Sequence, residues 1–379
     1  MGFLFLVHPV NAESVLWISA TSSIFSRFFY IWGFLAYTQW RQKLTRWRYY
    51  YLFLSMLGFV LGLASHEMAI TFPLIIFLYD LIFFISKKQE KLFPYLFSYV
   101  PFLVLTGVYF WIRKTSGAHG LSGDYSYNFK NLPFNFIGNL FGYTGELIFS
   151  YPFVAIYDST RFFLREHKLL MIPVMGILIV FVFLILKKTC YKKIKTETFK
   201  TILFFLGWYV ILLFPFLGLG NIAERYVYLA HGGLLALLVL FCDWVFKEFK
   251  KRSLLAGLLV EGFTLIAASI FYYSQIRKTQ DNWYQAGEIA NKILLAISTN
   301  YAKFPPESSL YFVDLPIRYD RAWVYPVGLE DGLWFIYRDK SLVVNKATDL
   351  EKTFELVKGK PNKYVFVFEE GQLKEVKEQ

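Results

Sequence analysis

The feature that most constrains this chain is a series of long apolar runs separated by short basic loops. The runs lie at about 19–39, 50–64, 68–85, 92–112, 168–186, 201–219, 226–246 and 253–273. A helix of about 20 apolar residues crosses the hydrocarbon core of a bilayer. We therefore expect an all-α polytopic transmembrane bundle of about eight helices.

The composition agrees with a membrane protein. Of the 379 residues 56% are hydrophobic and 18% are charged, whereas about a quarter are charged in an average soluble domain. The net charge of +12 would suggest nucleic acid as a partner in a soluble protein. Much of the excess lies in short loops between the apolar runs, which is typical of membrane orientation. We expect membrane lipid and not nucleic acid as the partner, because no nucleic-acid-binding motif is present.

The two cysteines, Cys190 and Cys242, form no pattern for a disulfide framework or a metal site. The second and third apolar runs flank Ser65-His66-Glu67. A single helix over 50–85 would be about 54 Å long, which is too long to cross the bilayer once. The sequence therefore predicts two helices that turn at these three residues.

The distribution of lysine and arginine predicts the orientation of the bundle. Four loops are strongly basic: 40–49, 86–91, 187–200 and 247–252. They alternate with segments of which the short ones carry little basic charge apart from Arg225: 1–18, 65–67, 113–167 and 220–225. Basic loops remain on the cytoplasmic side. We therefore expect residues 1–18 and the tail after 274 to lie outside the cytoplasm.

Residues 1–276 form the expected membrane domain, and residues 1–7 are interpreted as the end of a helix that begins upstream. Its long outer loop, 113–167, contains the apolar and aromatic stretch 136–149. This stretch fits an amphipathic helix on the membrane surface, and it fits equally a segment that packs against the bundle.

Residues 277–379 are expected to form a small extracytoplasmic α/β domain. The apolar spacing in 282–304 predicts a helix, which Pro305-Pro306 ends. Short apolar runs suit strands at 310–313, 342–344 and 364–368. Residues 349–357 fit a second helix.

Four polar clusters interrupt apolar surroundings, and the predicted orientation places all of them on the outer face. They are His8–Glu13, Ser65–Glu67, Trp111–Lys114 and Ala223–Tyr226. Ionisable groups at a membrane boundary are costly unless they are paired or solvated, so they are functional candidates.

Each cluster also has a structural interpretation. His8 or His66 would cap a helix or bond a backbone carbonyl, and Glu13 would cap the helix that follows it. Arg113 and Lys114 would extend to lipid headgroups, and Glu224 with Arg225 would form an interfacial ion pair. Two acids inside apolar runs, Asp80 and Glu261, are expected to pair within the bundle.

Three stretches occur in order and together suggest a family: HPVNAESVLWISA, LGLASHEMAITFPLIIFLYDLIF and FLGLGNIAERYVYLAHGGLLALL. Over about residues 1–300 the chain resembles the GT-C-fold membrane glycosyltransferases. The closest branch contains the TMTC-type (transmembrane and tetratricopeptide-repeat) protein O-mannosyltransferases and their bacterial relatives.

The resemblance implies that a sugar, such as mannose, is transferred from a polyprenyl-phosphate donor on the outer face, with inversion. A carboxylate would take the acceptor proton, and cations would hold the lipid phosphate. The candidate catalytic acids are Glu13 and Glu67. The candidate substrate-binding residues are His8, His66, Arg113, Glu224, Arg225 and Tyr226.

We expect no covalently bound cofactor besides the polyprenyl-phosphate-linked sugar as donor substrate, and the requirement for a metal stays open. The acceptor is a protein, a lipid or a glycan. The short tail without repeats favours a bacterial plasma membrane.

The chain departs from the family pattern at three points. The principal catalytic acid of GT-C enzymes lies in an outer loop that would precede residue 1, and His66 stands where relatives usually carry lysine. The tail lacks tetratricopeptide repeats, so a protein-acceptor role does not transfer. Two other functions are therefore weighed, a non-catalytic scaffold of the same fold and a transporter or flippase for lipid-linked sugars.

Overall fold

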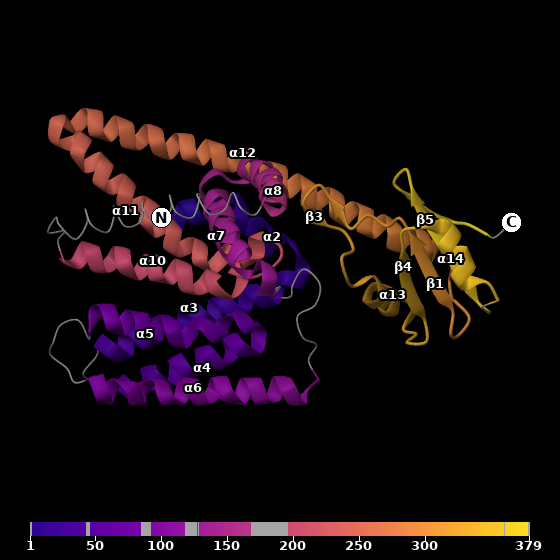
Figure 1. The fold of residues 1–379 in the computed structure, drawn as a ribbon, viewed down its shortest axis with the longest axis horizontal. Coiled ribbons are helices and arrows are strands. Elements are labelled where there is room, and N and C mark those ends of the chain that lie inside the picture. The colour runs from indigo at the N-terminus through magenta and orange to yellow at the C-terminus, as the bar shows by residue number, and fades with distance from the viewer. Residues whose placement is uncertain are drawn as a thin grey trace. The chain divides into compact units, whose positions relative to one another are not determined.

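The computed structural model describes residues 2–42, 46–84, 92–117, 127, 129–167, 196–359 and 361–377. They are mostly helical, and they form two compact units, Met1–Gln275 and Ile276–Gln379 (Figure 1). The expected span at 168–186, Cys190, the loop 86–91 and most of the loop 187–200 lie outside the described residues.

The first unit opens with short elements: α1 (Gly2–Leu6), η1 (Pro9–Asn11), α2 (Ala12–Leu16) and η2 (Ile18–Ala20). Its long helices are α3 (Thr21–Gln42), α4 (Arg48–Ser65), α6 (Leu92–Thr115), α10 (Thr196–Leu217), α11 (Glu224–Arg252) and the beginning of α12 (Leu254–Asn300). Within the described chain, four helices are long and apolar enough to cross a membrane: α4, α10, α11 and α12. These helices are consistent with the expected helical membrane protein.

The predicted turn at Ser65-His66-Glu67 is confirmed. Helix α4 ends at Ser65, and His66 has extended backbone geometry. A short 3-10 helix, η3 (Glu67–Thr71), leads into α5 (Phe72–Phe83). Pro73 stands in the first turn of α5, where its missing N–H costs no hydrogen bond.

Helices α3 and α4 pack closely because small residues face each other. A Cβ atom added to Gly58 would lie 2.8 Å from the Cα atom of Gly33 and 2.9 Å from the carbonyl oxygen of Phe29. Small residues of this kind let membrane helices approach closely. Fully buried aromatic side chains, among them Tyr30 and Phe59, fill the space beside this contact.

The loop 113–167 contains two helices, α7 (Leu132–Phe149) and α8 (Tyr151–Glu166). Helix α7 contacts α10 and α11. Its side chains at Asn139, Tyr143 and Glu146 are buried. Of the two alternatives for 136–149, packing against the bundle is therefore correct.

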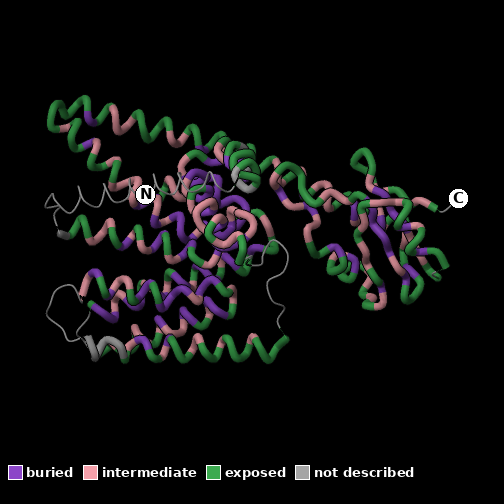
Figure 2. The backbone as a smooth tube through the Cα atoms, viewed as in Figure 1, coloured by how far each residue is buried: buried purple, intermediate pink, exposed green. Residues whose placement is uncertain are grey.

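Helix α12 differs from the expectation of two separate helices at 253–273 and 282–304. It runs unbroken over 47 residues, because the polar segment 274–281 contains no glycine or proline to end it. In its first half Leu255, Leu259 and Phe263 are each more than half exposed, as the exposed colour along α12 in Figure 2 shows. Among the described residues this apolar half of α12 is little covered, which suits a helix in contact with lipid.

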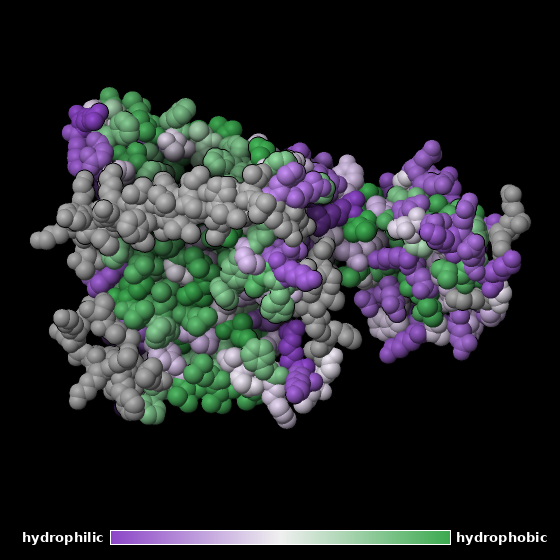
Figure 3. All heavy atoms as spheres, viewed as in Figure 1, coloured by the Kyte–Doolittle hydropathy of each residue, from purple (hydrophilic) through white to green (hydrophobic). Residues whose placement is uncertain are grey.

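The two units differ in the hydropathy of their surfaces, as the space-filling view shows (Figure 3). The visible face of the helical unit is largely hydrophobic, whereas that of the C-terminal unit is largely hydrophilic. Scattered apolar side chains are normal on a soluble domain, but a continuous apolar face is not. The first unit therefore has the surface of a membrane domain.

The second unit contains a four-stranded sheet in the order β4-β1-β5-β6. Its strands are β1 (Ser309–Val313), β4 (Val343–Ala347), β5 (Lys363–Glu369) and β6 (Gln372–Glu375). The first three are parallel, which requires crossover connections. These contain α13 (Leu329–Tyr337) and α14 (Leu350–Val357).

Three predicted strands and the predicted helix at 349–357 are confirmed in this unit. The sequence analysis missed α13, β6 and a small hairpin of β2 (Arg318–Tyr319) with β3 (Ala322–Trp323). The end of α12 belongs to the core of this unit, where Ile293 and Ile297 share a cluster with Phe312 of the sheet. The expected small α/β domain is therefore built on the last turns of α12.

Candidate functional site

The N-terminus of α11 is held by a carboxylate from a distant part of the chain. Oε2 of Glu13 accepts a hydrogen bond from the backbone N–H of Arg225 at 2.9 Å, and Oε1 accepts from its Nη1 at 2.5 Å. Only 8% of the Glu13 side chain is exposed. An anion at a helix N-terminus is stabilised by the unpaired N–H groups and the helix dipole. Glu13 therefore caps α11 and fixes the guanidinium of Arg225.

Arg27, on α3, completes this junction. It is 4% exposed, and its Nη2 donates to the carbonyl oxygen of Arg225. Its guanidinium also lies 4.6 Å from the ring centroid of Tyr228. The sequence analysis missed Arg27, although an arginine within an apolar run is itself a signal of a functional site.

His66 lies beside α3, where the hydroxyl of Ser26 donates to its carbonyl oxygen at 3.3 Å. Its Nδ1 accepts a hydrogen bond from the backbone N–H of Met68 at 3.1 Å, so the ring hydrogen is on Nε2. Burial lowers the pKa of His66, the neighbouring Glu67 opposes this, and Arg27, Arg225 and Arg113 add to the lowering. His66 is therefore neutral at neutral pH and presents Nε2–H as a donor.

Glu67 is the accessible carboxylate of the site. Its Oε2 lies 3.8 Å from Nδ1 of His66 and 3.9 Å from Nη1 of Arg113. Half of the Glu67 side chain, 51%, is exposed. Arg113 is oriented by a 2.9 Å hydrogen bond from Nη1 to the hydroxyl of Tyr109. A carboxylate that is close to cations and open to solvent can take a proton from a bound hydroxyl.

The segment before α11 is held by hydrogen bonds from α7 and α8. Nδ2 of Asn139 donates to the carbonyl oxygens of Leu217 and Leu219, each at 2.9 Å. Nη2 of Arg161 donates to the carbonyl oxygen of Gly220 at 2.7 Å. Buried backbone carbonyls need such partners. These bonds fix the path of the chain into Glu224 and Arg225.

We predict that Asn139→Ala lowers the free energy of unfolding by about 1–3 kcal/mol, because it leaves two buried carbonyl groups without a donor. Thermal unfolding of the detergent-solubilised chain measures this. Asn291→Ala, at an exposed position of α12, serves as the control and should have an effect within about 0.5 kcal/mol. Equal effects of the two substitutions would show that Asn139 does not hold this segment.

His8 does not join the charged cluster. Its Nε2 bonds the carbonyl oxygen of Leu147 at 2.8 Å, and its Nδ1 accepts from the N–H of Val10 at 3.2 Å. Its ring packs against His231, with centroids 4.2 Å apart. Burial lowers its pKa to about 4. His8 thus follows the structural interpretation, a neutral cap with both ring nitrogens engaged.

The other two candidates lie on the first turn of α11. Tyr226 is buried, its ring stacks on Phe216 at 4.3 Å, and its hydroxyl accepts from Nη2 of Arg225 at 3.2 Å. Glu224 is half-buried and begins the helix, where an acid suits the dipole. Both residues thus adjoin Arg225.

The two acids inside apolar runs are paired, as expected. Asp80 is fully buried and accepts hydrogen bonds from Nε of Arg41 at 2.7 Å and from the hydroxyls of Tyr37 and Tyr99 at 2.6 Å each. Glu261 pairs with Lys250 at 2.6 Å.

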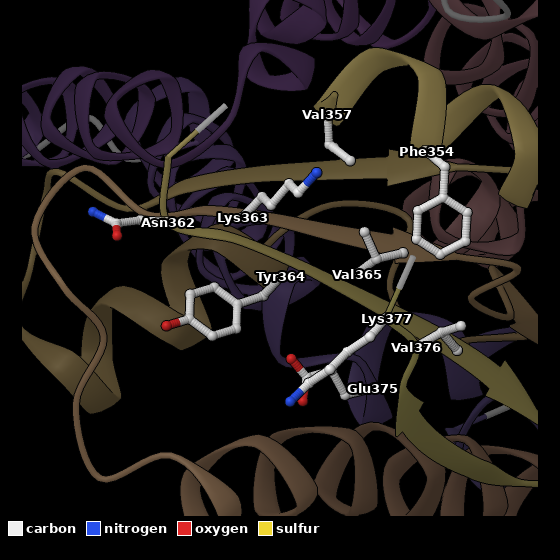
Figure 4. A pocket seen from close by; sticks show the side chains of 9 residues that line it. All are labelled: Phe354, Val357, Asn362, Lys363, Tyr364, Val365, Glu375, Val376 and Lys377. Atoms are coloured by element: carbon white, nitrogen blue, oxygen red, sulfur yellow. The ribbon is translucent and has the colours of Figure 1, made fainter. Parts of the chain in front are cut away.

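A separate hollow of about 570 Å³ lies in the C-terminal unit, at the beginning of β5 and the end of β6 (Figure 4). Phe354 and Val357 of α14 form part of its wall. Its one acid, Glu375, is bonded to the hydroxyl of Tyr301. Within the described part of the chain no group of three or more potential metal ligands is found. Lys363 and Lys377 also line this hollow, whereas the arginine cluster lies at α11.

No family model, curated protein or solved structure matches this chain. Its function is therefore argued from the geometry around α11. The structure brings together Glu13, His66, Glu67, Arg113 and Arg225 and adds Arg27, while His8 lies apart.

Proposed function

We propose that this chain is a membrane glycosyltransferase of the GT-C type, which moves a sugar such as mannose from polyprenyl phosphate to an acceptor hydroxyl. One observation carries the proposal. The half-exposed carboxylate of Glu67 lies beside His66 and near Arg113. The positive charges of Arg27, Arg113 and Arg225 all lower the pKa of His66. Such a transfer requires a carboxylate that accepts a proton and nearby cations that bind the phosphate.

The reaction that these groups would support is a single displacement. The acceptor oxygen bonds to the anomeric carbon as the bond from that carbon to the phosphate oxygen breaks. The acceptor proton passes to Glu67, and the electron pair leaves with the lipid phosphate. Arg113 and Arg225 stabilise the charge that develops on the phosphate, and Nε2–H of His66 adds a donor.

Glu13 has a different role in this proposal. Because its two oxygens engage the backbone and side chain of Arg225, it is a positioning residue. It holds a phosphate-binding guanidinium at the start of α11. Glu67 remains the carboxylate that can reach an acceptor.

The proposal includes the orientation argued from the basic loops. Eight spans would place the site and the C-terminal unit outside the cytoplasm, in a bacterial plasma membrane. Single cysteines at the exposed position 15 and at positions 67 and 224 should then react with an impermeant reagent from the same side. Labelling of position 67 from the side opposite to position 15 would contradict the shared site.

The decisive experiment is transfer in proteoliposomes that contain the full chain. Polyprenyl-phosphate mannose with a radiolabelled sugar is supplied, and the label is followed into protein, lipid and glycan acceptors. Transfer to one acceptor class, with release of polyprenyl phosphate, is the expected result. Movement of labelled lipid across the bilayer without transfer would instead identify a flippase.

A non-catalytic scaffold is the second candidate, and one observation favours it. Glu13, one of the two candidate catalytic acids, is engaged in a structural cap. A scaffold would bind polyprenyl phosphate without consuming the donor. Binding without transfer to any acceptor class in the same proteoliposomes would favour this candidate.

A further inference from the structure

Arg27 has a buried positive charge that no carboxylate of the described residues neutralises by direct contact. Its side chain is 4% exposed. One nitrogen, Nη2, donates to the carbonyl oxygen of Arg225. The other two, Nε and Nη1, have no hydrogen-bond partner within the described chain. Buried guanidinium nitrogens normally have acceptors. Within the described residues, Nε and Nη1 of Arg27 are therefore available to donate to a ligand.

The charges near Arg27 indicate that a ligand bound there would be an anion. Arg225 is paired with Glu13, and Arg113 lies beside Glu67. Arg27, the third guanidinium that acts on His66, has no acid of its own. Glu13, which also acts on Arg27 electrostatically, is already engaged by Arg225. Of these three guanidinium groups, Arg27 is the buried one without a direct carboxylate contact among the described residues, and burying such a charge is costly.

Two hydrogen-bond donors, Arg27 and His66, favour an oxyanion as the ligand. Arg27 offers N–H groups on Nε and Nη1, which lie on different edges of the guanidinium, so a phosphate oxygen can accept a charge-assisted hydrogen bond from either of them. His66 offers Nε2–H, for which the described residues provide no acceptor. A singly charged phosphodiester would neutralise the charge of Arg27 and accept hydrogen bonds from both side chains.

We propose that Arg27 is a binding residue for a phosphate oxyanion, and that its guanidinium donates to the ligand from α3 while Arg225 and His66 contact it from α11 and the α4–α5 turn. The assignment of that phosphate to a lipid-linked sugar rests on the proposed function. The anion site itself rests on the unpartnered nitrogens of Arg27 and on the charge balance.

The melting temperature of the ligand-free protein distinguishes this binding role of Arg27 from a purely structural role. If Arg27 waits for an anion, Arg27→Met removes an uncompensated buried charge. The melting temperature without ligand should then stay the same or rise. If Arg27 mainly holds the Arg225 carbonyl, the same substitution should lower it.

The test measures the thermal shift and the dissociation constant of the full chain in neutral detergent. The probes are inorganic phosphate, a short-chain polyprenyl phosphate and the uncharged polyprenol. The variants are Arg27→Met and Arg27→Lys. The matched control is Arg48→Gln, because Arg48 is a half-buried arginine at the opposite end of the α3–α4 pair, beside Trp40.

We expect polyprenyl phosphate to stabilise the wild-type chain and polyprenol to have no such effect. Arg27→Met should weaken phosphate binding on the order of tenfold to a hundredfold, as for the loss of a charged hydrogen bond. Arg27→Lys should retain part of the binding, and Arg48→Gln should bind like the wild type. A shift with inorganic phosphate alone would identify a free phosphate as the ligand, and a shift with the lipid alone would identify a lipid headgroup.

Two results would overturn the inference: no stabilisation of the wild-type chain by any phosphate, or unchanged phosphate binding in Arg27→Met. A lower melting temperature of ligand-free Arg27→Met would also overturn it in favour of the structural role. Failure of the proposed function is separate, because it would show as Arg27-dependent phosphate binding without sugar transfer.

Discussion

Glu67→Gln is expected to reduce sugar transfer by about 10²–10⁴-fold, the contribution typical of a general base. The amide has nearly the shape of the carboxylate but cannot take the acceptor proton. Since 51% of the Glu67 side chain is exposed and its contacts with His66 and Arg113 are longer than 3.5 Å, the folded state should hardly change. The measurement is the initial transfer rate in proteoliposomes at equal protein content.

The matched control is Glu248→Gln, because the Glu248 side chain is 52% exposed and also contacts a cation, Lys251. It lies at the other end of α11 and should retain full activity. Binding of polyprenyl phosphate should be similar in Glu67→Gln and in the wild type. If Glu67→Gln transferred sugar within about twofold of the wild-type rate, Glu67 would not be the base.

Arg41→Leu is expected to lower the free energy of unfolding by about 3–5 kcal/mol, because it leaves the carboxylate of Asp80 buried without its cation. Asp80 is 0% exposed, and Nε of Arg41 lies 2.7 Å from its Oδ1. Two tyrosine hydroxyls, of Tyr37 and Tyr99, share the same carboxylate and cannot neutralise it. The measurement is chemical unfolding of the chain in detergent.

The double variant Arg41→Leu/Asp80→Leu should lose less stability than Arg41→Leu alone, since no buried charge remains. Lys247→Leu is the control for loss of a cation, because its partner Asp243 is exposed and such pairs contribute about 0–1 kcal/mol. Equal losses in the single and double variants would contradict the pairing of Arg41 with Asp80.

The elements of this fold that follow from local pattern could be predicted. The turn at Ser65–Glu67 and the strands near 310, 343 and 365 were recognised because apolar length and spacing are properties of neighbouring residues. The continuous α12 was missed. A polar stretch between an apolar run and an amphipathic one resembles a linker, although none of its residues breaks a helix.

The candidate site shows the same division. The sequence by itself determined which residues carry charge and hydrogen-bonding groups at the ends of apolar runs, among them Glu13, Glu67 and Arg225. Only the tertiary structure decided how they are used. Glu13 caps a helix whose bonded residue, Arg225, is 212 positions away. Both ring nitrogens of His8 form hydrogen bonds with the backbone. Arg27 contacts two residues of α11, which is distant in sequence. The physical reason is that burial and pairing of a charge depend on which segments contact each other in the folded chain. Local periodicity does not determine those long-range contacts.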